Sequence, residues 1–175
     1  MMSGNSLNSL SDRHEIRCSW HALDESADEL AQFFFMNVDP SYISHSEMWE
    51  GRATGPNEWA VDLNNRISQE YTEIISSSSR SKRIGIAKEG CNTIGLVVVC
   101  MNEAAKYCVL EDMVIARLWR NSGVGERLLE WVVAEVRSCN IQSMFLESGI
   151  GNTAAHRFFQ KHGFERCSIV MSRTL

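Results

Sequence analysis

A glycine-bearing turn at 120–125, with the sequence Arg-Asn-Ser-Gly-Val-Gly, constrains the fold more than any other feature. The apolar, β-branched residues before it, at 109–116, predict a strand, and apolar residues recur at helical spacing over 124–136 after it. Such a turn leaves backbone N–H groups unpaired at a helix start, where the helix dipole helps them to bind a phosphate or pyrophosphate. The motif alone is equally compatible with a tight connection that binds nothing.

Two common nucleotide-binding motifs do not describe this turn. It lacks the Gly-Lys-Ser/Thr ending of a Walker-type loop. A dinucleotide-binding motif lies in the first βα turn, with an acidic residue about 20 residues later. Here the turn follows several predicted strands, and the next strand carries its acid only at Glu147.

The length and net charge of the chain limit its number of domains and its possible partners. The 175 residues, 44% of them hydrophobic, predict one globular domain, which we expect to span 13–175. The Ser- and Asn-rich residues 1–12 predict a disordered tail. The net charge of −5 argues against nucleic acid as a partner and is compatible with a cationic one.

The cysteines do not form a recognisable framework. Six are scattered without a Cys-x-x-Cys pair, and no histidine lies at metal-ligand spacing. The sequence shows neither a signal-peptide pattern nor an apolar run long enough to span a membrane. We therefore expect a cytoplasmic protein with reduced thiols, no metal ion and no membrane partner.

Hydrophobic periodicity and turn residues predict elements in the order β-α-α-β-β-β-α-β-α-β. The expected strands are 15–20, 82–88, 93–101, 107–116, 141–146 and 164–171. The expected helices are 26–36, 59–75, 124–138 and 153–162. The first begins with a capping box, and Asp39-Pro40 prevents it from continuing. Segment 41–55 shows no clean period. The order predicts an α/β fold in which a mixed sheet has helices on both faces.

With this order the chain resembles the GNAT superfamily of N-acetyltransferases. Their cofactor motif, Arg/Gln-x-x-Gly-x-Gly/Ala after the fourth strand, is matched by Arg120, Gly123 and Gly125. A second family motif, Asn-x-x-Ala-x-x-Phe-Tyr-x-x-x-Gly-Phe, follows about 30 residues later. It is met by Asn152, Ala155, Phe158, Gly163 and Phe164, with Phe159 where tyrosine is usual. The resemblance covers 82–173 well and 14–80 only by element order.

The resemblance implies a mostly antiparallel sheet that splays between its fourth and fifth strands and holds acetyl-CoA in the gap, without a metal. The pyrophosphate would rest on backbone N–H groups of the glycine turn, and the pantetheine arm would pair with the end of the fourth strand. The residues expected at the cofactor are Met113, Val114, Ile115, Arg120, Asn121, Ser122, Gly123, Val124, Gly125, Asn152, Ala155, Phe158 and Phe159.

Acetyl transfer to an amine needs a base, because an amine with a pKa of about 10.4 is almost wholly cationic at neutral pH. Glu111 and Asp112 lie next to each other on the fourth strand, and a Leu-Glu-Asp here resembles polyamine-acetylating members of the family. Adjacent strand residues face opposite ways unless a bulge intervenes, and such a bulge is common in the family. We expect Glu111 to be the base and Asp112 the ammonium anchor. The reverse assignment, or a structural role for one of them, stays open.

Phe159 removes a group that many members use. Their tyrosine at this place protonates the departing thiolate, and phenylalanine has no hydroxyl. Three possibilities remain open: water supplies the proton, one of Tyr107, His156 or Ser148 substitutes, or the protein binds acyl-CoA and catalyses poorly.

The acceptor side should come from 37–58, where acidic and aromatic residues alternate. We expect Asp39, Tyr42, Glu47 and Trp49 to bind a cationic amine through ion pairs and cation–π contacts. A core role for the aromatic residues and a solvated role for the acids are the alternatives. Arg52, in the same segment, suggests instead an acidic group on the acceptor.

The sequence thus predicts an enzyme that transfers acetyl from acetyl-CoA to a primary amine of a small molecule, such as a polyamine, an aminoglycoside or an aminoalkyl compound. The alternatives are acetylation of a protein lysine or N-terminus, and an idle acyl-CoA-binding sensor. A homodimer is possible.

Overall fold

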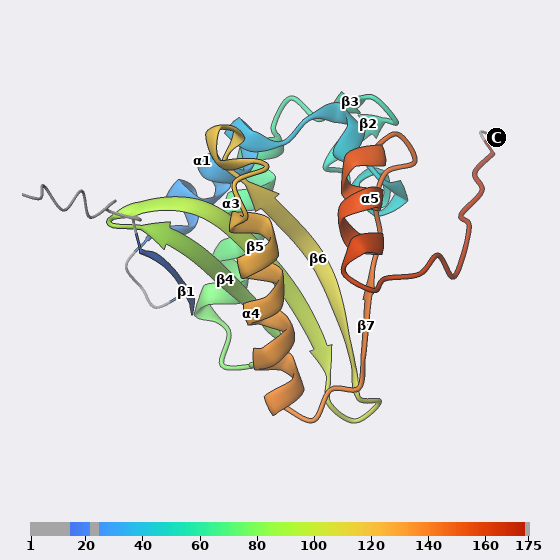
Figure 1. Ribbon diagram of the computed structural model, residues 1–175. Helices are drawn as coiled ribbons and strands as arrows, with labels where there is room; N and C mark the ends of the chain where they lie inside the picture. The colour runs from blue at the N-terminus through green and yellow to red at the C-terminus, as the bar shows by residue number, and fades with distance from the viewer. Residues whose placement is uncertain (1–14, 22–24, 174–175) are drawn as a thin grey trace, which may run out of the picture.

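The structure, a computed structural model, describes residues 15–21 and 25–173. The expected tail at 1–12 lies outside these residues. The centre is a five-stranded sheet in the order β1-β4-β5-β6-β7 (Figure 1). Its strands are β1 (Ile16–Trp20), β4 (Lys82–Glu89), β5 (Asn92–Asn102), β6 (Tyr107–Ile115) and β7 (Ser143–Leu146). All neighbours pair antiparallel except β6 and β7, which are parallel, so the predicted mixed, mostly antiparallel sheet is confirmed.

Helices cover both faces of the sheet, as predicted (Figure 1). On one face α1 (Ala27–Asn37) and α3 (Leu63–Ser76) enclose a core with Leu96 and Val98 of β5. On the other face α4 (Val124–Ser138) packs against Val97 and Val99, with side chains of α5 (Thr153–Lys161) at its border. Successive β5 side chains therefore belong to different cores, which explains why this strand is apolar throughout.

A β-bulge interrupts β6 at Glu111. Val98 of β5 lies opposite Asp112, and the next residue, Val99, lies opposite Leu110, so Glu111 is the extra residue on β6. Bulges of this kind bend a strand and redirect its side chains. A bulge of the kind that is common in the resembled family is thus present, and it lies where the two acidic residues occur.

The sheet splays just beyond the bulge. Pairing between β6 and β7 ends with Leu110 opposite Leu146, so, among the described residues, 111–115 have no strand partner on the β7 side. The predicted opening between these two strands is therefore present, and the ribbons of β6 and β7 diverge there (Figure 1).

The segment without a clean sequence period is partly regular. It contains a 3-10 turn (Pro40–Tyr42), α2 (His45–Trp49), and β2 (Ala53–Gly55) paired with β3 (Glu58–Trp59). A Ser44–Glu47 capping box begins α2, and this sequence signal was missed.

The second expected helix, 59–75, was predicted to begin too early. It begins at Leu63, because Glu58–Trp59 pairs with β2 and the chain turns at 60–62 before entering α3.

The expected last strand at 164–171 is wrong. Residues 164–173 have no strand structure, and within the described part of the chain no strand pairs with the outer edge of β7. Phe164 packs against Phe159, and the chain then leaves the body, with Ile169 89% and Met171 90% exposed (Figure 1). A strand-like pattern needs a partner edge, and β7 offers only four residues.

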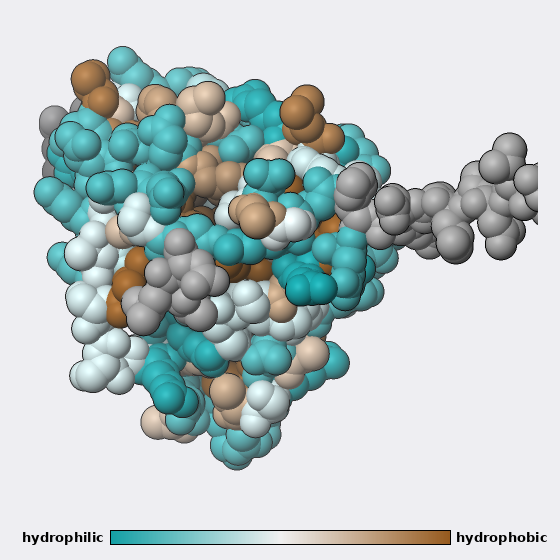
Figure 2. All heavy atoms as spheres, turned by 90° about the vertical axis from the view of Figure 1, so that its left-hand side faces the viewer, coloured by the Kyte–Doolittle hydropathy of each residue, from teal (hydrophilic) through white to brown (hydrophobic). Residues whose placement is uncertain are grey.

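The surface around the β1 edge of the sheet is mostly hydrophilic, and its apolar side chains form small separate groups (Figure 2). Of the helices in the described residues, none is both long enough and apolar enough to span a membrane.

Candidate active site

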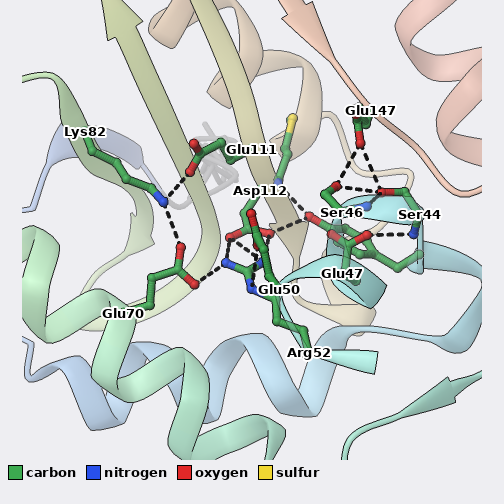
Figure 3. A network of polar contacts seen from close by, with 12 residues as sticks. Ser44, Ser46, Glu47, Glu50, Arg52, Glu70, Lys82, Glu111, Asp112 and Glu147 are labelled. Atoms are coloured by element: carbon green, nitrogen blue, oxygen red, sulfur yellow. Dashed lines mark hydrogen bonds and ion pairs between the residues drawn. The ribbon is translucent and has the colours of Figure 1, made fainter. Parts of the chain in front are cut away.

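The bulge places Glu111 and Asp112 in one chain of ion pairs (Figure 3). Glu111 Oε2 lies 2.6 Å from Lys82 Nζ, which also contacts Glu70 Oε1 at 2.8 Å. Glu70 in turn pairs with Arg52, whose Nη1 lies 3.1 Å from Asp112 Oδ1. Sequence reasoning missed Glu70 and Lys82, since they lie on a helix and a strand far from the acidic pair and no motif joins them.

Asp112 is completely buried, and its oxygen atoms are already bonded. Arg52 donates to both of them, and the Tyr42 hydroxyl donates to Oδ1 at 3.0 Å. Arg52 itself is only 4% exposed. The guanidinium therefore occupies the place that we expected an acceptor ammonium to take, and it is not free to bind an acidic group of an acceptor.

Glu111 is the more accessible member of the pair, with 28% of its side chain exposed. Burial raises the pKa of its carboxyl above the ordinary value, and the hydrogen bond and charge of Lys82 offset only part of this effect. A carboxylate with a raised pKa at an accessible site has the properties of a general base.

Two cavities meet at Glu111. The smaller, about 150 Å³, is bordered by α2 and also contains Glu47, Glu50 and Glu147 in its lining. The larger, about 530 Å³, extends along β5 and β6 to the turn between them. Both lie where a molecule could reach Glu111 without disturbing buried Asp112.

The expected acceptor residues are only partly brought together. Tyr42 lies beneath the site, bonded to Asp112, and Glu47 lines the smaller cavity while accepting the Ser44 N–H at 2.6 Å as a helix cap. Trp49 is 84% exposed, with its ring against His45.

Asp39 lies apart from these residues. It pairs with Arg117 at 2.8 Å and with Arg120 at 2.9 Å, beside the glycine turn. Burial raises the pKa of its carboxyl, but the two guanidinium groups lower it more, so the net direction is downward. Asp39 and Arg120 therefore hold the turn against the end of α1.

The glycine turn has the geometry of an anion site. Gly123 is the N-cap of α4 with φ +89°, Asn121 has φ +61°, and no side chain in the described part of the chain caps the helix. The first-turn N–H groups are consequently left without a side-chain acceptor. The residues of this turn, including Ser122, whose hydroxyl donates to the Trp119 carbonyl, thus fit a pyrophosphate.

The other expected cofactor residues converge on this turn. A Cβ at Gly125 would lie 3.6 Å from both Ile115 and Phe158, so the end of β6, the start of α4, and α5 meet here. Asn152 is the N-cap of α5, and its side chain accepts the Ala155 N–H at 3.3 Å.

The remaining members of the expected set flank the opening. Phe159 packs on Phe158, and Val114 and Val124 are buried in the two cores. The Met113 N–H donates to the Tyr42 hydroxyl at 3.2 Å, so one backbone donor of the expected pantetheine-pairing segment is already bonded.

The three alternative proton donors lie in different environments. The Ser148 hydroxyl is buried, follows the end of β7, and has no hydrogen-bond partner among the described residues. Tyr107 packs against Phe145 at the start of β6, and His156 lies on α5. Ser148 is therefore the unpaired hydroxyl nearest in sequence to the splayed strand end.

Glu147 connects this strand end to α2. Its carboxylate accepts the Ser46 hydroxyl at 2.8 Å and lies 3.0 Å from His45 Nδ1. The residues after Glu147 pack tightly on segment 37–58, because Gly149 lies directly against the backbone of 41–43.

We expect Gly149→Ala to lower the free energy of unfolding by about 1–3 kcal/mol, as overpacking does elsewhere. Its Cβ would lie 2.3 Å from the Ile43 carbonyl oxygen and 2.6 Å from that of Ser41, and backbone cannot move aside cheaply. Urea unfolding measures the change. Gly151→Ala is the control, because its Cβ would meet nothing within 4 Å. Equal stability of the two variants would contradict the tight contact.

In the part of the chain that the structure describes, no three His, Cys, Asp or Glu side chains are grouped as a metal site would require. The absence of a metal stays a prediction.

Comparison with known proteins agrees with this architecture. The sequence profile described as the Acetyltransferase (GNAT) family matches residues 42–164. A search of curated proteins gives no match.

Solved structures with a similar fold are distant in sequence. A putative acetyltransferase of the GNAT family from Desulfovibrio desulfuricans is 17% identical, with a TM-score of 0.67 over 88% of this chain and 87% of that one. The aminoglycoside N-acetyltransferase AAC(6')-Iy in complex with CoA is 14% identical, with a TM-score of 0.62 over 92% and 95%. A transcriptional regulator from Bacillus halodurans is 12% identical, with a TM-score of 0.66 over 92% and 100%.

Proposed function

This chain belongs to the acetyltransferase (GNAT) family, and from that premise we propose that it transfers acetyl from acetyl-CoA to a primary amine of a small, cationic molecule. Acyl transfer follows from the family. The donor, the amine and the small size of the acceptor are our proposal.

The observation that carries the proposal is the position of Glu111. It lies on the bulge where β7 leaves β6, and it faces two cavities. The uncapped start of α4 lies beyond the other end of the unpaired part of β6. The acidic group and the anion site therefore flank one strand segment, as a base and a pyrophosphate cradle should.

The charges of the site favour a cationic acceptor. Four carboxylates, those of Glu50, Glu70, Glu111 and Asp112, are joined to two cations, those of Arg52 and Lys82. This leaves two negative charges, and an acceptor ammonium would balance one of them. The name of the aminoglycoside N-acetyltransferase with the same fold supports an amine of this kind.

Each residue then has a defined part. Acetyl-CoA supplies an activated acetyl group as a thioester, and the N–H groups at 121–125 would hold its pyrophosphate. Glu111 accepts a proton from the acceptor ammonium, which frees the nitrogen lone pair to attack the carbonyl carbon. The C–N bond forms as the C–S bond breaks, and the nitrogen then loses its second proton. Water or the Ser148 hydroxyl passes that proton on to the thiolate, in place of the tyrosine that Phe159 replaces.

We expect Lys82→Gln to shift the acidic limb of the rate profile to higher pH. Lys82 lowers the pKa of Glu111, so its removal raises that pKa further, and the base is then deprotonated only at higher pH. The measurement is kcat/KM as a function of pH. A shift to lower pH, or no shift, would contradict Glu111 as the titrating base. Arg137→Gln, at an exposed site on α4, is the control.

The proposal is tested by thiol release from acetyl-CoA against a panel of spermidine, an aminoglycoside, an aminoalkylphosphonate, amino acids and a lysine peptide. Turnover of a small amine supports it. Turnover of the peptide alone would indicate a protein acetyltransferase. Binding of acetyl-CoA without turnover would overturn it in favour of a sensor.

A further inference from the structure

The lining of the larger cavity next to Glu111 changes along its length from acidic to apolar and then to a pair of opposite charges. Glu111 forms one end, and Val109 and Cys100 lie on the strands that form its middle. Arg80 and Glu103 come from the two loops at the far end, so opposite charges lie there. The volume of about 530 Å³ falls within the range of about 300–1,000 Å³ for small-molecule sites.

The charged side chains at the far end of the cavity, Arg80 and Glu103, take no part in the ion pairs that the described residues form. Arg80 lies between α3 and β4, and Glu103 lies in the turn between β5 and β6. Within the described residues, neither side chain makes a hydrogen bond or ion pair. A guanidinium binds a carboxylate through two parallel hydrogen bonds, and a carboxylate binds an ammonium. Together they match the zwitterionic head of an α-amino acid.

The distance between the ends sets the length of the ligand. The cavity follows β6 from Tyr107 to Glu111, which is about 13 Å at ~3.3 Å per residue. Both charged loops lie at the Tyr107 end, so the Arg80 and Glu103 side chains would have to cover part of this length. An aliphatic stem of several methylene groups, lying over Val109, would join the head to an amine at Glu111.

We propose that the acceptor is an aliphatic diamino acid, acetylated on the amine at the end of its side chain. Its α-carboxylate binds Arg80, its α-ammonium binds Glu103, and its terminal ammonium gives a proton to Glu111. This assignment rests on the proposed function for the transfer step, but the recognition of the head group is independent of it.

Three ligands separate the contributions: L-lysine, cadaverine, which lacks the carboxylate, and 6-aminohexanoate, which lacks the α-amine. Binding to the full-length, CoA-loaded protein is measured by calorimetry, and turnover by thiol release from acetyl-CoA. We expect L-lysine to bind about 10- to 100-fold more tightly than either analogue, as hydrogen bonds to charged groups imply.

Two variants assign the contacts. Arg80→Met should weaken L-lysine and 6-aminohexanoate and leave cadaverine unchanged. Glu103→Gln should weaken L-lysine and cadaverine and leave 6-aminohexanoate unchanged. Arg137→Met, at an exposed site on α4, should alter none of the three affinities.

The two measurements keep the proposals apart. Equal binding of the three ligands, no binding of L-lysine, or a uniform loss in Arg80→Met would overturn the diamino-acid assignment. Selective binding of L-lysine without turnover would uphold the head-group site and overturn the proposed transfer.

Discussion

Glu111→Gln should lower kcat/KM for the acceptor amine by about 10²- to 10⁴-fold, the range that general acid–base catalysis supplies. The amide cannot accept the ammonium proton, yet it keeps the size of the side chain and can still meet Lys82. Because burial raises the pKa of Glu111, the wild-type rate should fall as the pH drops through that pKa, and the variant should lose this dependence. Steady-state thiol release over a range of pH measures both effects.

Two further observations make the result specific. Glu73→Gln changes an exposed carboxylate on α3 and should keep the wild-type rate. Acetyl-CoA affinity should be the same in the wild type and Glu111→Gln, because the expected pyrophosphate site lies at the start of α4. A variant that turns over as fast as the wild type would exclude Glu111 as the base.

The fold was largely predictable because its signals are local. The glycine turn and the amphipathic pattern of α4 each depend on a few adjacent residues, and α4 begins and ends where expected. The strand at 164–171 failed because an alternating pattern shows what a segment can bury and not whether a partner edge exists.

The site was harder to predict, since its contacts join distant residues. The sequence indicated an acidic pair on a bulge, but not that Arg52 would fill the space beside Asp112. That ion pair links residues 60 positions apart, and Glu70 and Lys82 come from two further elements. In the sequence, Arg52 only argued against a cation-selective pocket. In the structure it binds Asp112 and lines the smaller cavity.

Arg52→Met should lower the free energy of unfolding by about 3–5 kcal/mol, as removal of one partner from a buried ion pair does. Asp112 is completely buried, and after the change the Tyr42 hydroxyl would be the one group among the described residues that bonds its side chain. Asp112→Leu should cost less, because Glu70 still pairs with Arg52. Urea unfolding of the protein without ligands provides these values.

The double variant Arg52→Met with Asp112→Leu identifies the cause. If the cost of Arg52→Met is an uncompensated charge, removing that charge should restore part of the stability, so the double variant should lose less than the two single losses combined. Arg66→Met breaks an exposed pair with Asp62 and should cost about 0–1 kcal/mol. Additive losses would mean that Arg52 and Asp112 act separately, and Asp112 would again be a candidate anchor for the acceptor. Strong coupling would show instead that Asp112 holds Arg52 and the acceptor segment in place, which leaves Glu111 to meet the amine.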